Sequence, residues 1–272
     1  MRIMTAEHVL DSRPLDPVRR TANKVPEVTV YFWIIKVLTT GMGETASDFL
    51  AKALGPVPAV GLGGLALIAS LAVQFALRRY VAWAYWTAVV MVSVVGTMAA
   101  DVLHVGLGVP YVASTPAFLV VLAAVFALWY RSEGTLSIHG IRTRRREVFY
   151  WAAVLATFAL GTAAGDLTAA IGFGYLGSVV LFALAICLPA LAHRFGTLNA
   201  VTAFWTAYVI TRPLGASLAD WMALGHTRGG LGLGLAPVTL AWTAAIVAFV
   251  AYLAVSRRDV RVNANINVNV NV

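Results

Sequence analysis

The feature that most constrains this chain is a spacing that occurs four times: an aromatic residue and Trp, nine residues, Gly, four residues, and Asp. The copies are Phe32-Trp33…Gly43…Asp48, Tyr85-Trp86…Gly96…Asp101, Tyr150-Trp151…Gly161…Asp166 and Phe204-Trp205…Gly215…Asp220. Each copy lies in an apolar stretch long enough to cross a bilayer, which takes ~20 residues as a helix. The sequence is therefore an internal repeat that places one carboxylate per copy inside a membrane, where a carboxylate is energetically costly.

Composition agrees with a membrane environment. Charged residues make up 12% of the chain and hydrophobic residues 60%, whereas a soluble domain carries about 25% charged residues. We therefore predict an all-α membrane protein. The eight predicted transmembrane helices are 28–50, 58–78, 82–104, 111–130, 148–170, 174–193, 199–222 and 231–255.

The formal net charge of +8 is explained by where the basic residues lie. They gather before the first span, after the last span and in alternate loops, whereas the opposite loops hold only Lys52 and Arg228. The gathered residues are Arg13, Arg19, Arg20, Lys24, Arg78, Arg79, Arg131, Arg142, Arg144, Arg145, Arg146, Arg194, Arg257, Arg258 and Arg261. This positive-inside pattern predicts that both termini are cytoplasmic, with the lipid bilayer rather than nucleic acid as the partner.

The chain is expected to have three segments. These are a cytoplasmic N-terminal segment over 1–27, a transmembrane domain over 28–255 and a cytoplasmic low-complexity tail over 256–272. The repeat unit is two helices, of which the first carries the motif, and the four repeats cover about 28–78, 82–130, 148–193 and 199–255. Because each unit begins and ends on the same side, the four repeats have a parallel orientation. A homo-oligomer is compatible with this architecture.

A polar stripe runs along each motif helix. Positions +3, +7, +11 and +15 from each Trp share one helix face. They are Lys36, Thr40, Glu44 and Asp48; Val89, Ser93, Thr97 and Asp101; Val154, Phe158, Thr162 and Asp166; Tyr208, Arg212, Ala216 and Asp220. Such a stripe on an apolar helix faces other protein segments or a water-filled cavity.

The four motif glycines have a structural interpretation. Each of Gly43, Gly96, Gly161 and Gly215 is followed four residues later by another small residue. This spacing lets helix backbones approach closely, so we expect these glycines at helix–helix contacts. Close packing would also bring the aspartates of neighbouring repeats toward one another.

The stripe predicts a cation site. Four like-oriented units put four carboxylates at one depth around a pseudo-symmetry axis, and rings of acidic residues select cations. We expect Asp48, Asp101, Asp166, Asp220 and Glu44 to be the metal ligands, with Thr97 and Thr162 supplying further oxygens. Oxygen ligands without a thiolate suit hard ions such as Mg²⁺, Mn²⁺ or Ca²⁺. No cofactor is expected beyond a bound cation.

Two basic residues occur on the same stripe, in the first and fourth copies only. Lys36 and Arg212 could neutralise part of the acidic cluster, or Lys36 could extend to the inner membrane surface. Since a cation and protons could compete for the same oxygens, the pattern allows a proton-coupled cation transporter. The first alternative is a proton-coupled carrier of a small organic solute, whose anionic group Lys36 and Arg212 would bind. The second is a scaffold or partner-binding protein without transport activity, in which the aspartates only fix or end helices.

No nucleotide-binding glycine motif or nucleophile motif is present, so we do not expect an enzyme.

The stretch from Lys24 to Leu50, KVPEVTVYFWIIKVLTTGMGETASDFL, resembles the opening of a bacterial family of uncharacterised membrane-anchored proteins built from a repeat of unknown function. The resemblance extends through the four repeats, over about residues 24–255, and implies a multi-pass protein of the bacterial inner membrane without naming a substrate. The fourth copy departs from the first, because Ala216 stands where the first has Glu44, and Arg212-Pro213 where it has Thr40-Gly41.

Overall fold

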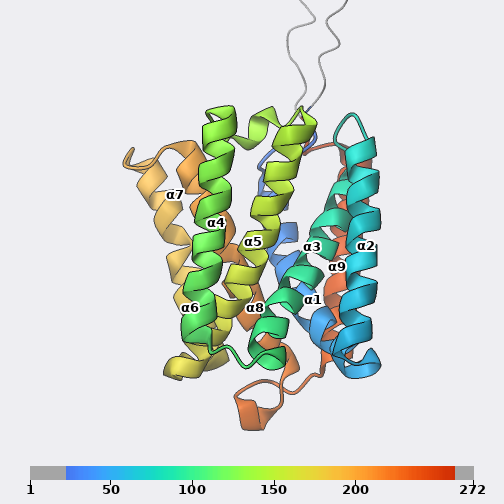
Figure 1. Cartoon of the computed structure of the whole chain (residues 1–272), viewed down its shortest axis with the longest axis vertical. Coiled ribbons are helices and arrows are strands. Elements are labelled where there is room, and N and C mark those ends of the chain that lie inside the picture. Colours follow the sequence, from blue (N-terminus) through green and yellow to red (C-terminus); the bar gives the residue numbers. More distant parts are fainter. Residues whose placement is uncertain (1–22, 261–272) are drawn as a thin grey trace, which may run out of the picture.

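The computed structural model describes residues 23–260, and every regular element in that range is helical (Figure 1). The α-helices are α1 (Val30–Leu54), α2 (Pro56–Ala76), α3 (Ala82–Asp101), α4 (Tyr111–Glu133), α5 (Arg144–Thr168), α6 (Gly174–Ala185), α7 (Cys187–Arg194), α8 (Ala200–Ala223) and α9 (Leu235–Ser256). Shorter π or 3-10 turns are η1 (Val102–Gly106), η2 (Ile138–Gly140), η3 (Ala169–Phe173) and η4 (His226–Arg228). The predicted all-α class is confirmed. Parts of the two predicted terminal segments, residues 1–22 and 261–272, lie outside the described residues.

Five helical segments among the described residues are long and apolar enough to cross a membrane, which agrees with the predicted membrane environment. They are Pro56–Ala76, Ala82–Gly106, Tyr111–Glu133, Arg144–Arg194 and Leu235–Ser256. Helices α1 and α8 have 25 and 24 residues. They carry all the charged residues of the polar stripe other than Asp101 and Asp166, which lowers their mean hydropathy. Both helices are shielded by neighbouring helices of the bundle.

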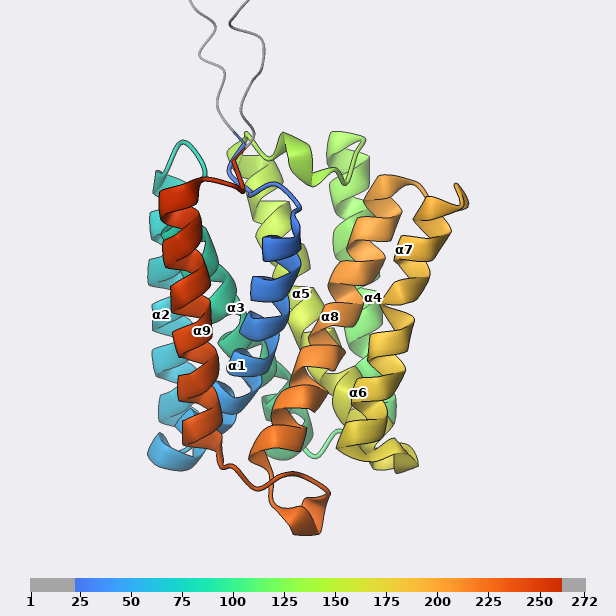
Figure 2. The ribbon, with the colours of Figure 1, turned by 180° about the vertical axis from the view of Figure 1, so that it is seen from behind.

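The predicted helix over 174–193 is divided into two. Helix α6 ends at Ala185 and α7 begins at Cys187. Pro189 explains the break, because it has no N–H group to donate to the carbonyl oxygen of Ala185, four residues earlier. Figure 2 shows α7 leaning away from the rest of the bundle.

The four motif helices form a closed inner ring. Helix α1 packs against α3, α3 against α5, α5 against α8, and α8 returns to α1. Each remaining helix packs on the motif helix of the next repeat: α2 on α3, α4 on α5, α6 and α7 on α8, and α9 on α1. All four motif helices begin at the end of the bundle where the described chain begins and ends (Figures 1 and 2). The repeats are therefore arranged in parallel around one axis.

Aromatic contacts repeat with the same cyclic order. In every copy, the first aromatic ring of the motif contacts the Trp of the next copy, and the fourth copy pairs with the first. The ring centroids are 5.6 Å apart in two pairs and 5.7 and 6.1 Å apart in the others. The pairs are Phe32–Trp86, Tyr85–Trp151, Phe204–Trp33 and Tyr150–Trp205. An aromatic layer thus closes the ring near the end that holds the described chain ends.

The motif glycines lie at the closest approaches of the inner helices. A Cβ atom added to each glycine would lie 2.5 to 2.8 Å from the Cβ atom of position +7 in the next repeat. The pairs are Gly43 with Ser93, Gly96 with Phe158, Gly161 with Arg212, and Gly215 with Thr40. Any larger residue at these positions would push two motif helices apart.

Polar contacts hold the same end of the bundle together. The Lys24 ammonium group donates to Glu147 at 2.6 Å, and both side chains are buried. The Tyr80 hydroxyl donates to the Asp259 carboxylate, and the Glu27 amide donates to the Asp259 carbonyl oxygen at 2.9 Å. Burial raises the pKa of Asp259, and the hydrogen bond from Tyr80 opposes that shift. These contacts join segments from both ends of the described chain to the helices between them.

The glycine contacts make a prediction about stability. Replacing Gly43 by Ala should destabilise the protein by about 1–3 kcal/mol, because the new methyl group overlaps Ser93 on the next motif helix. The matched control is Gly64→Ala in α2, where an added Cβ meets nothing within 4 Å. There, Ala should be neutral or stabilising because it favours the helix. Thermal unfolding of the purified protein in detergent measures both, and equal effects at the two sites would contradict the packing role.

Candidate functional site

The polar stripe of each motif helix faces the axis of the inner ring. Its innermost polar side chains are inaccessible to solvent, with Lys36, Thr40, Thr97 and Arg212 all 0% exposed. Asp220 is also buried, whereas Asp48, Asp101 and Asp166 are half-buried. Solvent access along the axis therefore increases from the +3 layer toward the aspartates.

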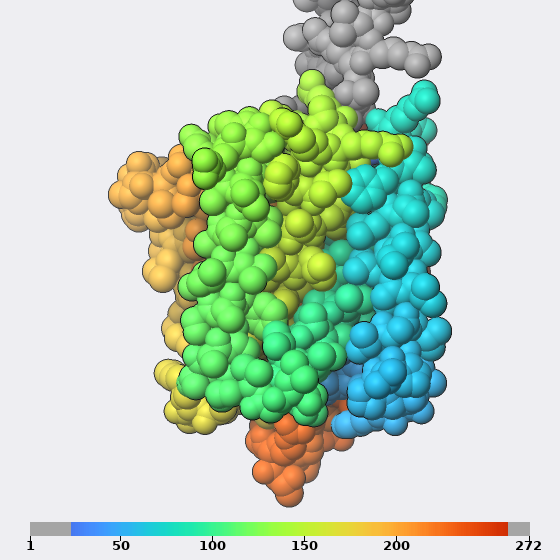
Figure 3. Space-filling model, in the orientation of Figure 1, coloured from blue at the N-terminus to red at the C-terminus, as the bar shows by residue number. Residues whose placement is uncertain are grey.

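One cavity collects the acidic residues. It has a volume of about 510 Å³, and its lining includes Asp48, Asp101, Asp166, Asp220 and Glu44. One aspartate comes from each repeat, and Glu44 lies one helical turn below Asp48. The cavity is at the end of the bundle opposite the described chain ends. Figure 3 shows the segment around 224–234 protruding at that end.

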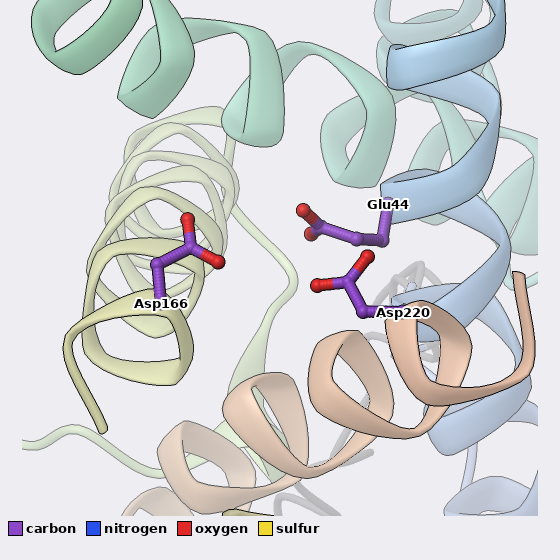
Figure 4. Close-up of side chains that lie close together, drawn as sticks. All are labelled: Glu44, Asp166 and Asp220. Carbon is purple, nitrogen blue, oxygen red and sulfur yellow. The ribbon is translucent and has the colours of Figure 1, made fainter. Parts of the chain in front are cut away.

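Three carboxylates lie close enough to share one ion. Glu44, Asp166 and Asp220 each offer an oxygen atom, and these atoms all lie within 4.8 Å of one another (Figure 4). They come from α1, α5 and α8, so three repeats contribute. Asp48 and Asp101 line the same cavity outside this group, and Asp101 accepts a hydrogen bond from Ser47 at 3.4 Å. The donor set consists of hard oxygen atoms, which bind divalent and other hard cations.

Arg212 does not itself line the cavity, but it is bonded to Glu44, which does. Its Nη2 atom is 2.7 Å from Glu44 Oε2 and 2.5 Å from the Thr162 hydroxyl oxygen, and it also donates to Thr97. Its Nη1 atom donates to the carbonyl oxygen of Thr40 at 2.9 Å. The two threonines predicted as cation ligands therefore accept hydrogen bonds from a guanidinium group in this structure.

Lys36 lies further from the cavity and does not line it. Its ammonium nitrogen is 4.0 Å from the ring centroid of Phe158 and 4.1 Å from that of Tyr208. No hydrogen-bond partner contacts this nitrogen among the described residues. The alternative in which Lys36 extends to the inner membrane surface is wrong, because the side chain is fully buried against aromatic rings. The two basic residues thus differ, since Arg212 is paired with a carboxylate and Lys36 is held only by aromatic faces.

Several cavity residues do not belong to the motif. Tyr111 and Tyr175 line the wall, and Arg228 donates to the Tyr175 hydroxyl at 2.9 Å. Tyr111 is the first residue of α4, and Tyr175 is the second residue of α6. Each follows the aspartate of its own repeat by about ten residues. A tyrosine at this spacing after the aspartate therefore occurs in only two of the four repeats. The repeat pattern alone was too incomplete to predict that these tyrosines line the cavity.

Two of the aspartates lie next to an irregular helical turn. Asp101 is the last residue of α3 and is followed directly by the π turn η1. Asp166 lies two residues before the end of α5, which continues into the π turn η3. Such turns occur often at functional sites, because they re-aim side chains within a helix. The sequence pattern predicted regular helix there, and no spacing signal marks these turns.

The comparison with known proteins identifies the repeat. A family model described as "Repeat of Unknown Function (DUF347)" matches the chain four times, at residues 31–80, 84–135, 149–196 and 203–259. These bounds agree with the predicted repeats 28–78, 82–130, 148–193 and 199–255, which confirms the four-copy organisation. No curated protein and no solved structure matches the chain.

The different surroundings of the two basic residues predict opposite effects on stability. Arg212→Met should destabilise the protein by about 3–5 kcal/mol, because it leaves the Glu44 carboxylate buried without its partner. Lys36→Met should raise the unfolding temperature, because it removes a buried amine without a hydrogen bond and keeps the side-chain volume. Thermal unfolding measures both variants. Destabilisation by Lys36→Met would show that the contacts with Phe158 and Tyr208 outweigh the cost of burying the amine.

Proposed function

We propose that this chain, which belongs to the family built from the Repeat of Unknown Function (DUF347), is a membrane transporter that binds a cation in the acidic cavity. The observation that carries the proposal is the convergence of one aspartate from every repeat, together with Glu44, on a single cavity. Carboxylates in a membrane domain are costly, and close helix packing does not require them. A role in binding positive charge accounts for their number and for their shared location.

The finer membrane topology is part of the proposal. The protein would cross the bacterial inner membrane eight times, with α6 and α7 together forming the sixth span and both termini in the cytoplasm. This is supported by the distribution of charge. The loops and helix ends on the side of the described chain ends contain Arg78, Arg131, Arg142 and Arg194, among others. Arg228 lines the cavity at the other end. The cavity would then open toward the periplasm.

Charge balance supports a cation as the ligand. Arg212 neutralises Glu44, which leaves four aspartates around the cavity. Among residues 23–260, Arg228 is the one basic side chain in the cavity lining. A divalent ion such as Mn²⁺ would offset two negative charges, and bound protons would offset others. Exchange of protons for the ion at the same oxygens would supply the coupling for transport.

The closed side of the site supports a carrier rather than an open channel. Between the cavity and the other end of the axis lie Arg212, Lys36 and the aromatic layer formed by the motif rings. Two basic side chains on the axis oppose the passage of a cation. Release to the cytoplasm would therefore need a change in this layer, as in alternating access.

A proton-coupled carrier of a small organic solute is the second candidate. The cavity volume of about 510 Å³ favours it, because pockets of roughly 300–1,000 Å³ are typical for small molecules. The predicted contact of a solute anion with Lys36 is disfavoured, since Lys36 does not line the cavity. In this form of the proposal, the solute would be cationic and would contact the aspartates and the ring of Tyr111 or Tyr175.

Ligand-dependent stability tests the proposed site. Purified protein is heated with Mn²⁺, Mg²⁺, Ca²⁺, Zn²⁺, Na⁺ or K⁺, and a cation that binds only the folded state raises stability by about 2.7 kcal/mol at 100 times its Kd. We expect one hard cation to raise the unfolding temperature selectively. The shift should be lost in Asp166→Asn and Asp220→Asn, because each variant removes a charged oxygen from the trio with Glu44.

The matched control is Asp259→Asn at the opposite end of the bundle. It should lower the starting unfolding temperature, because the hydrogen bond from Tyr80 loses its charged acceptor, but it should retain the full cation shift. A cation shift that survives in Asp220→Asn would contradict the proposed site. If a cation binds, its uptake into liposomes containing the protein, with and without a pH gradient, distinguishes transport from binding alone.

A further inference from the structure

The Glu44–Arg212 ion pair occupies the place where the cavity meets the closed part of the axis. The side chains are 5% and 0% exposed, and their closest atoms are 2.7 Å apart. The same guanidinium nitrogen also donates to Thr97 and Thr162. A positive group that belongs to the protein therefore already uses one of the cavity carboxylates, together with two hydroxyl oxygens that could contact an ion.

Asp220 has the opposite arrangement. It is 5% exposed, yet its carboxylate receives no hydrogen bond or ion pair from any residue in the range 23–260. The carboxylate points toward Glu44 and Asp166 in Figure 4. Asp220 lines the cavity, so a positively charged partner that enters the cavity can reach this carboxylate without displacing a donor of the described residues. That partner would also be within reach of Glu44.

We propose that Arg212 competes with the bound cation for Glu44, so that some or all of its hydrogen bonds to Glu44 must break when a cation binds. The inference rests on the proposed cation site and adds how that site is regulated. Glu44 Oε1 receives no hydrogen bond from the described part of the chain, so an ion can approach that oxygen first. Coordination through both carboxylate oxygens requires Arg212 to release Oε2.

The surroundings of Arg212 show which part of it can move. A Cβ added to Gly161 would lie 2.5 Å from the Arg212 Cβ, so the base of the side chain is held against α5. The guanidinium carbon lies 5.3 Å from the ring centroid of Phe158, a surface that can receive it. Lys36 lies on the same ring at 4.0 Å. When Lys36 is protonated, its charge opposes the movement of Arg212 away from Glu44.

This competition would connect the cavity to the closed layer. A cation that displaces the guanidinium from Glu44 drives a positive charge toward Phe158 and Lys36, which lie between the cavity and the aromatic ring of the motif. Loading of the site and rearrangement of the layer that seals it would thus be one coupled event. A carrier needs such coupling, because a site that loads without altering its seal binds the ion but does not move it.

A double-mutant cycle tests the proposal. The affinity for Mn²⁺ is measured by titration calorimetry for the wild type, Arg212→Gln, Glu44→Gln and the variant with both substitutions. We expect Arg212→Gln to bind Mn²⁺ roughly tenfold more tightly, because a like charge no longer competes for Glu44. With Glu44 already replaced by Gln, the same change should alter the affinity by less than about twofold, because the shared carboxylate is absent. The double variant also controls for folding, since neither residue is left charged.

Three results would overturn the proposal. They are weaker Mn²⁺ binding by Arg212→Gln, equal tightening in both backgrounds, and no change in either. If Arg212→Gln does not fold, Arg212→Lys replaces it, because Lys retains the charge but not the paired donors that hold Glu44. Arg212→Lys should still tighten binding, though less, and an unchanged affinity would count against the competition. Absence of Mn²⁺ binding in every variant would reject the cation site itself, whereas wild-type binding without dependence on the Glu44–Arg212 pair rejects only the competition.

Discussion

The close approach of the four motif helices at their glycines is the constraint on which the rest of the structure depends. Each glycine accepts the +7 side chain of the next repeat, and the fourth repeat accepts that of the first. This cyclic contact brings the helix backbones together and turns the polar stripes toward one axis. The outer helices then complete the bundle by packing on the next motif helix. The aspartates converge because the glycines close the ring.

The four motif helices are arranged symmetrically around the axis, but the charged residues along it are not. This difference makes the two ends of the axis unlike each other. Four aspartates repeat at one end and four aromatic pairs at the other. Between them, the first and fourth repeats place Lys36, Glu44 and Arg212 where the other repeats have uncharged residues. These exceptions produce one ion pair and one unpaired buried amine rather than a continuous acidic pore. The residues common to all repeats therefore line the cavity, and the residues that differ between repeats close its inner side.

Much of this arrangement could be predicted from spacing. Helix periodicity placed the stripe on one face, and a fourfold repeat of parallel units implied a common axis. The partner of Arg212 could not be predicted, because Glu44 lies 168 residues away and several acids were equally plausible. Lys36 was equally open, since the sequence does not reveal that Phe158 and Tyr208 enclose it. Tyr111 and Arg228 come from segments without the motif, so only the folded structure brings them to the cavity. Pro189 could have predicted the division between α6 and α7. The uninterrupted run of hydrophobic residues there instead suggested a single helix.

The most direct test of the central claim is to locate a bound ion. A crystal or frozen-hydrated sample of the full chain prepared with Mn²⁺ can be examined for anomalous scattering or for density at the axis. We predict one ion among Glu44, Asp166 and Asp220, whose oxygen atoms already lie within 4.8 Å of one another. An ion bound only outside the cavity, or an empty cavity at a Mn²⁺ concentration that stabilises the protein, would contradict it.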